Sequence, residues 1–236
     1  MPTDALLRPR RLRLVQRRTL WCLTWLGAFC VALFLAAPAV WWFYCGESFL
    51  SLTERRPAEI LVVEGWIGRK GLDAAVDEFE RGGYRYIVAS GCLTSGGWED
   101  KRESYAEMAA GEMIRLSVPK ESIIVAHSRN TKNHRTFESA VTTWRTLRDS
   151  GIKPAQLNVF TFGPHAGRSA LVFTKVYSDG SKIGVIGWVP AEYDREPWWL
   201  SSERARELLE ETVGYVYELL FNSGRHSNSP ADNSSD

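Results

Sequence analysis

The stretch Phe162-Gly163-Pro164-His165-Ala166-Gly167-Arg168-Ser169 follows an apolar run at 157–162 and precedes a segment of helical periodicity at 170–176. Glycine and proline commonly end strands, so the stretch predicts a strand, a tight exit and a helix start. The first turn of a helix carries free backbone N–H groups and a partial positive charge, which favour bound anions. A ligand site at His165 and Arg168 is one interpretation, and an ordinary exposed helix start is the other.

The same alternation of an apolar run with a helical period occurs five times within residues 58–222. Near-continuous apolar strands that alternate with helices are typical of a parallel sheet covered on both faces. We therefore expect a Rossmann-like α/β three-layer sandwich with a mostly parallel five-stranded sheet. The expected strands are 60–63, 86–89, 123–126, 157–162 and 183–188.

The last expected helix covers residues 202–221, with Ser202 as a suitable N-cap. Its apolar residues recur at helical spacing, and such a row usually faces the core. The residues expected to point inward are Leu209, Val213, Val216 and Leu220.

The N-terminal part of the chain is basic and then apolar. Residues 1–19 contain six arginines and one acid, and residues 20–44 contain no charged residue. About 20 apolar residues suffice to cross a bilayer as a helix, and arginines stay on its cytoplasmic side. We expect a cytoplasmic segment 1–19, a transmembrane helix 20–44 in the plasma (inner) membrane, and an extracytoplasmic main domain. A cleaved signal peptide is the alternative, because Ala37-Pro38-Ala39 has the form of a cleavage site.

Other features limit the possible functions. Residues 45–57 are expected to be a polar linker, and residues 223–236 a disordered tail rich in Ser, Asn and Asp. Acidic residues outnumber basic ones after residue 19, which argues against a nucleic-acid partner.

A disulfide bond between Cys45 and Cys92 is chemically permitted on the outer side of the membrane, although nothing in their spacing requires it. The oligomeric state stays open.

Metal and dinucleotide motifs are not apparent in the sequence. The cysteine and histidine spacings match no metal motif, so no metal is expected. The glycines that follow Glu64 lack the third position of a dinucleotide fingerprint, so NAD is not indicated and any cofactor is unknown.

Polar and glycine residues follow four of the expected strands. In α/β sheets, ligands bind beyond the carboxyl ends of the strands, where the strand order reverses. We interpret Glu64 and His165 as catalytic residues for proton transfer, with ion pairing or helix capping as their structural alternatives. The residues expected to bind the substrate are Ser90, Gly91, Ser128, Asn130, Thr131, Arg168 and Ser169.

A Pro/Trp-rich loop at 190–199 contains Trp198 and Trp199. Indole rings pack against sugars or lie at a membrane surface, and they also pack in ordinary cores. A lid or a membrane-proximal contact is therefore one interpretation of this pair.

With these segments in order, the chain resembles the SanA/ElyC/YdcF-like family of bacterial envelope proteins. The resemblance covers residues 58–190 and rests on four motifs: Val62-Val63-Glu64-Gly65, Ser90-Gly91, Ser128-x-Asn130-Thr131 and Pro164-His165-x-x-Arg168-Ser169. It implies a Rossmann-like domain with a role in cell-envelope or peptidoglycan-precursor metabolism, and several members have one N-terminal anchor.

The chain departs from the family pattern at four places, one of which is an arginine ahead of the first helix that has no aligned equivalent here, although Arg69 and Lys70 are close. Trp66 replaces a glycine after the first strand, and Tyr105 stands where the family has a glutamate. Asn-Thr-x-Glu-Asn becomes Asn130-Thr131-Lys132-Asn133-His134. Two acidic residues of the family pattern are therefore missing from this chain, and with them part of the acid/base chemistry that the resemblance implies.

We therefore expect a membrane-anchored enzyme, a hydrolase or transferase, that acts on a phosphorylated or lipid-linked sugar. The alternative is a non-catalytic module that binds an envelope glycan or protein. A third hypothesis is an enzyme that uses a nucleoside-type ligand at the strand ends.

Overall fold

The computed structural model describes residues 24–92, 103–128, 134–177 and 180–221. The chain divides into two compact units, Met1–Trp41 and Trp42–Asp236. Helix α1 (Trp25–Leu50) begins in the first unit and ends in the second. By length and composition it is apolar enough to cross a membrane, a test that a signal sequence near the N-terminus also passes. It ends six residues beyond the expected limit of the apolar span.

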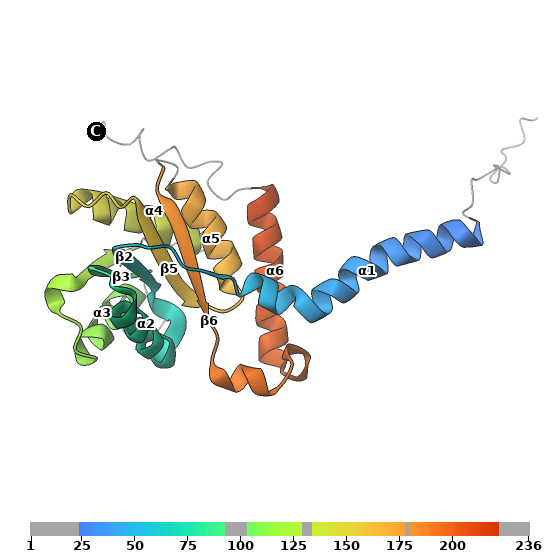
Figure 1. Cartoon of the computed structure of the whole chain (residues 1–236), viewed down its shortest axis with the longest axis horizontal. Coiled ribbons are helices and arrows are strands. Elements are labelled where there is room, and N and C mark those ends of the chain that lie inside the picture. The colour runs from blue at the N-terminus through green and yellow to red at the C-terminus, as the bar shows by residue number, and fades with distance from the viewer. Residues whose placement is uncertain (1–23, 93–102, 129–133, 178–179, 222–236) are drawn as a thin grey trace, which may run out of the picture. The chain divides into compact units, whose positions relative to one another are not determined.

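A six-stranded sheet forms the centre of the second unit (Figure 1). Its order is β1-β6-β5-β2-β3-β4, and every neighbouring pair except β1 with β6 is parallel. The strands are β1 (Thr53–Glu54), β2 (Ile60–Glu64), β3 (Tyr86–Gly91), β4 (Ile123–His127), β5 (Gln156–Phe162) and β6 (Lys182–Trp188). The Rossmann-like α/β fold expected from the sequence is therefore confirmed.

Strand β1 was not predicted, and it lies in the segment expected to be a linker. Its two residues are exposed and polar, so they carry no alternating pattern, yet Thr53 pairs with Ile186 at the edge of the sheet. Residues 45–50 of the same expected linker belong to α1, and Leu50 is fully buried. The segment is thus packed on the domain rather than free.

Helices cover both faces of the sheet (Figure 1). On β2, Leu61 and Val63 pack toward α2 and α3, while Ile60 and Val62 pack toward α4 and α5. The helices are α2 (Gly68–Gly82), α3 (Tyr105–Arg115), α4 (Arg135–Asp149), α5 (His165–Val176) and α6 (Ser202–Leu220). Short 3-10 turns are η1 (Gly65–Ile67), η2 (Lys120–Ser122), η3 (Ala191–Arg195) and η4 (Trp198–Leu200). Because all residues of β2 are buried, the strand reads as an unbroken apolar run up to Glu64.

Two local signals determine where α3 begins. The Ser104 hydroxyl accepts a hydrogen bond from the Glu107 backbone N–H (3.0 Å), and the Glu107 carboxylate accepts one from the Ser104 N–H (3.0 Å). This capping box satisfies two N–H groups at the start of the helix. This cap was not identified from the sequence.

Helix α6 packs against α5, and the expectation about its orientation was wrong. Leu209, Val213, Val216 and Leu220 are exposed rather than inward. The buried residues of this helix are Arg204, Leu208 and Glu218, and its N-cap is Ser201. The inner face of α6 is therefore largely polar, because it borders charged groups of the neighbouring elements rather than the apolar core.

Candidate functional site

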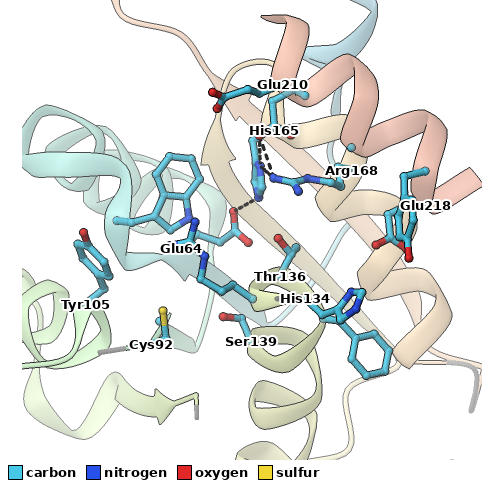
Figure 2. Close-up of a pocket in the computed structure, with 17 residues that line it drawn as sticks. Glu64, Cys92, Tyr105, His134, Thr136, Ser139, His165, Arg168, Glu210 and Glu218 are labelled. Atoms are coloured by element: carbon cyan, nitrogen blue, oxygen red, sulfur yellow. Dashed lines mark hydrogen bonds and ion pairs between the residues drawn. The ribbon is translucent and has the colours of Figure 1, made fainter. Parts of the chain in front are cut away.

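The strand order reverses between β2 and β5. The chain continues from β2 to β3 on one side of the sheet and from β5 to β6 on the other. A cavity of about 490 Å³ lies at the carboxyl ends of these strands, lined by residues from the strand exits and from α3, α4, α5 and α6 (Figure 2). This is where the topology of α/β sheets places ligand sites, and we call it the switch-point cavity.

His165 lies at the centre of an ionic cluster in this cavity. It is the first residue of α5, directly after Pro164, and only 4% of it is exposed. Its Nε2 lies 3.3 Å from Glu64 Oε2, and its Nδ1 lies 3.0 Å from Glu211 Oε1. We call Glu64, His165 and Glu211 the acid–imidazole cluster. Figure 2 shows His165 between Glu64 and the guanidinium of Arg168.

The cluster determines the charge of the imidazole. Burial alone would lower the pKa of His165, but the charges of Glu64 and Glu211 outweigh burial and raise this pKa to about 9. The ring is therefore protonated at neutral pH, and each of its nitrogens faces a carboxylate; Nδ1 also lies 3.0 Å from Arg168 Nη2. This raised pKa could not be predicted from the sequence, which does not reveal two carboxylates around one ring.

Glu64 ends β2 and is held by two hydroxyl groups besides His165. The Thr161 hydroxyl donates a hydrogen bond to Glu64 Oε2, and the Ser169 hydroxyl lies 3.2 Å from both carboxylate oxygens. Although burial opposes ionisation, the charge of His165 and the hydrogen bonds of His165 and Thr161 lower the pKa of Glu64 below its usual value. Glu64 is thus an ionised and firmly oriented carboxylate.

Glu211 belongs to α6 and joins His165 to Arg168. Arg168 Nη2 lies 2.9 Å from Glu211 Oε1, the same oxygen that faces His165. Despite burial, the charges of His165 and Arg168 lower the pKa of Glu211. A Cβ at Gly214 would lie 3.0 Å from Arg168 Cδ, so the glycine permits this close packing of α5 against α6. Arg168 therefore already has a carboxylate partner.

The predicted substrate-binding residues fall into three groups. Gly91 and Arg168 line the cavity. Ser90, Ser128 and Ser169 are buried behind its wall, where they bond to Thr143 (3.0 Å), Ser139 (3.2 Å) and Glu64 respectively. Asn130 and Thr131 lie outside the described residues. A direct contact of these residues with substrate stays a prediction.

Two glycines allow Tyr105 to reach the cavity. A Cβ at Gly65 would lie 2.3 Å from the Tyr105 carbonyl oxygen, and a Cβ at Gly91 would lie 2.7 Å from Tyr105 Cβ. No side chain fits at either position without a shift, so the start of α3 lies directly against the exits of β2 and β3. Tyr105 and Trp66 both line the cavity.

Sequence reasoning missed the contribution of α6. Glu210, Glu211, Tyr217 and Glu218 all line the cavity. A detectable signal was the spacing of Arg204, Leu208, Glu211, Tyr215 and Glu218, which recur at helical intervals opposite the apolar row. We assigned the apolar face to the core by the usual rule, and that assignment concealed these acidic residues.

The lining combines acidic and aromatic side chains. Its four carboxylates belong to Glu64, Glu210, Glu211 and Glu218, and its rings include Trp66, Tyr105, Phe137 and Tyr217. Three cations, His165, Arg168 and Arg135, also line it. Two of them are already paired with carboxylates, so the described part of the lining has no surplus of positive charge for a multiply charged anion. Carboxylates that accept hydrogen bonds next to aromatic faces instead suit a polyhydroxylated ligand.

Among the described residues, no group of three or more His, Cys, Asp or Glu is arranged to hold a metal ion. Cys45 and Cys92 are both free thiols. No protein-family model matches this chain, and no curated protein matches it either.

Proposed function

We propose that this protein is an enzyme of the cell envelope, anchored in the plasma membrane by α1, that acts on a sugar-containing precursor in the switch-point cavity. The observation that carries the proposal is the acid–imidazole cluster at the point where the strand order reverses. The apolar helix and the family resemblance support the envelope location.

The cluster supplies the two halves of a proton-transfer pair. Glu64 is ionised and accepts the proton of an attacking hydroxyl group or water. His165 carries a proton at neutral pH and can release it to a leaving group, which suits general acid chemistry. Glu211 positions the ring from the other side, and its own charge keeps His165 protonated.

The charge of the lining favours the sugar part of the precursor as the group held in the cavity. Sugar hydroxyls can donate to Glu210 and Glu218, and the faces of Trp66 and Tyr105 can pack against a pyranose ring. Among the described lining residues, Arg135 is the arginine that we expect to face a phosphate, because Glu211 engages Arg168. This assignment differs from the expectation that Arg168 holds the anionic group.

A turnover experiment tests the proposal. Full-length protein in nanodiscs is incubated with polyprenyl-diphosphate-linked sugars and with soluble sugar phosphates, and products are identified by mass spectrometry. We expect turnover by the unmodified protein and a loss of roughly 100-fold or more in kcat for Glu64→Gln and His165→Gln, as for removal of a general acid or base. Glu80→Gln on the exposed face of α2 is the matched control and should leave kcat unchanged.

A non-catalytic glycan-binding module is the second candidate. It is favoured by the fact that both ring nitrogens of His165 face carboxylates, which is also how a fixed structural charge is held. Binding of the sugar ligand without turnover by the unmodified protein would identify the module. Neither binding nor turnover with any of these ligands would contradict both assignments.

A further inference from the structure

The outer face of α6 carries a continuous apolar row. Leu209, Val213, Val216 and Leu220 lie at i, i+4, i+7 and i+11, and they are 59%, 69%, 43% and 62% exposed. Single exposed apolar residues are normal on protein surfaces, whereas a contiguous row on one helix face marks an interaction surface. We call these four residues the outer row of α6.

The outer row cannot turn inward, because the opposite face of α6 is fixed by specific contacts. The Arg204 guanidinium binds both oxygens of Glu47 (2.7 and 2.8 Å), and Leu208 is 1% exposed. Glu211 bonds to His165 and Arg168 in the switch-point cavity. A rotation of the helix would break all of these contacts, so the exposure of the outer row is built into the fold.

Helix α6 is also held directly to the last turns of α1, within the second unit. Phe49 meets Tyr215 edge to face with ring centroids 5.7 Å apart, and Arg204 binds Glu47 as described. In η4, which immediately precedes α6, Trp198 Nε1 donates to the Phe43 carbonyl oxygen (3.0 Å), and Trp199 stacks on Phe43 at 4.7 Å. The segment by which the chain enters this unit is therefore in contact with α6 and η4.

These contacts bring the outer row near a bilayer if α1 spans one. The 19 residues of α6 extend about 28 Å at 1.5 Å per residue, so the row lies within about 30 Å of the end of the anchor. Trp199 and Tyr44, whose rings are in contact, are 41% and 68% exposed, and tryptophan and tyrosine are typical of the membrane–water interface.

We propose that the outer row of α6 lies on the lipid surface of the membrane that α1 spans. The occupant is lipid rather than a second copy of the chain for two reasons. Four aliphatic side chains fall well short of the roughly 1,200 Å² that a stable protein interface buries. In addition, a covalent anchor makes contact with the bilayer intramolecular, so that modest burial of about 1.5 to 3 kcal/mol per side chain is sufficient.

This geometry identifies the substrate class more closely, and to that extent it rests on the proposed function. Helix α6 separates the outer row from Glu211 and Gly214 of the cavity lining, and a helix with its side chains is about 10 Å wide. The cavity thus lies about one helix diameter from the lipid headgroups. A ligand with a sugar head and a long hydrocarbon tail fits this arrangement, since its tail stays in the bilayer while its head enters the cavity.

Depth measurement with a fluorescent label tests the contact on the full chain. The four native cysteines are replaced by alanine, and single cysteines are introduced at Val213, at Phe34 in α1 and at Glu80 on α2. Each is labelled with an environment-sensitive dye in nanodiscs of phosphatidylethanolamine and phosphatidylglycerol. Nitroxide-bearing lipids should lower the emission at Val213→Cys and Phe34→Cys by roughly twofold, because an interfacial helix face lies about 5 to 10 Å below the headgroup boundary. Emission at Glu80→Cys should not change.

A charge inserted into the row provides a second measurement. In a Val213→Glu background, a label at Val216→Cys should lose its quenching by nitroxide lipids, while Glu80→Gln as the background should preserve it. Circular dichroism of each variant checks that the domain remains folded.

The outcomes separate this inference from the proposed function. If Phe34→Cys is quenched and Val213→Cys is as solvent-exposed as Glu80→Cys, the anchor stands and the surface contact is overturned. If Phe34→Cys is not quenched, the anchor and the contact both fail. Disulfide cross-linking between two Val213→Cys chains without lipid quenching would show a second copy on the outer row and would overturn the assignment to lipid.

Discussion

Two buried polar clusters lie at opposite ends of the central strands, and they differ in their surroundings. At the carboxyl end, Glu64, His165 and Glu211 form the acid–imidazole cluster that lines the switch-point cavity. Near the amino end, Asn158 on β5 is fully buried and joins Tyr84 to the backbone of Arg56. Neither Asn158 nor Tyr84 lines that cavity.

The two clusters differ in whether their polar groups are neutral and fully paired or charged. Asn158 Oδ1 accepts from the Arg56 N–H (2.9 Å), and Nδ2 donates to the Arg56 carbonyl (2.8 Å) and to the Tyr84 hydroxyl (2.8 Å). Its neutral groups are matched donor to acceptor, which is typical of a structural role. The acid–imidazole cluster instead concentrates charge beside an open cavity, and perturbed ionisation in such a place is typical of a functional site.

The largest expected effect comes from breaking the cluster of Asn158, Tyr84 and the backbone of Arg56, which we call the amino-end cluster. Asn158→Leu leaves the Arg56 N–H, the Arg56 carbonyl and the Tyr84 hydroxyl without their partner. Each buried polar group left unpaired costs about 1 to 3 kcal/mol, so we expect the free energy of unfolding to fall by about 3 to 5 kcal/mol. Urea unfolding of the full chain in detergent, followed by tryptophan fluorescence, measures it. A loss below about 1 kcal/mol would contradict the structural role.

A pH series tests the acid–imidazole cluster. The pKa of His165 is raised to about 9 in the folded protein, against 6.5 as the ordinary value. A raised pKa stabilises the fold fully below pH 6.5, and that contribution is lost as the pH rises through 9. The free energy of unfolding should therefore fall by about 3 kcal/mol across this window, relative to His165→Gln, which lacks the titrating ring.

His127→Gln is the matched control for this series, because the side chain of His127 is half exposed. Its unfolding profile should follow that of the unmodified protein. If the unmodified protein and His165→Gln lost stability in parallel between pH 6.5 and 9, the two carboxylates would not be holding an imidazolium.

The smallest effect is expected for a variant of Tyr84, which belongs to the same cluster as Asn158. Tyr84→Phe removes one hydroxyl that accepts from Asn158 and lies 3.3 Å from Glu78 Oε1. Glu78 keeps Arg55, which binds both of its oxygens (2.9 and 3.1 Å), so the loss should be about 1 kcal/mol in urea unfolding. An effect as large as that of Asn158→Leu would mean that Tyr84, rather than the backbone of Arg56, is the main partner.

Much of the fold could be predicted from the sequence. All five parallel strands were predicted within two residues of their ends, because strands buried on both faces are nearly continuous apolar runs. Strand β1 was missed because two exposed residues carry no such signal, and only pairing with β6 makes them a strand. Glu64 and His165 were singled out correctly as neighbours at one edge, since parallel strands share their carboxyl ends.

The third member of the cluster could not be predicted in the same way. Glu211 lies 46 residues after His165 in the chain, and no local pattern relates the two. It faces the cavity because α6 turns its polar side inward, against the default rule for amphipathic helices. The choice between the two faces depends on the charged partners Glu47, His165 and Arg168, which come from elsewhere in the chain.

By itself, the sequence determined the alternation of strands and helices, the apolar N-terminal span and the position of a polar edge at the strand ends. These follow from local periodicity and composition, which act over a few residues. The protonation of His165, the pairing of Arg168 with Glu211 and the exposure of the outer row of α6 became apparent only in the folded structure. Charge and burial at a site depend on groups that are distant in the chain, so they are determined only when the elements pack together.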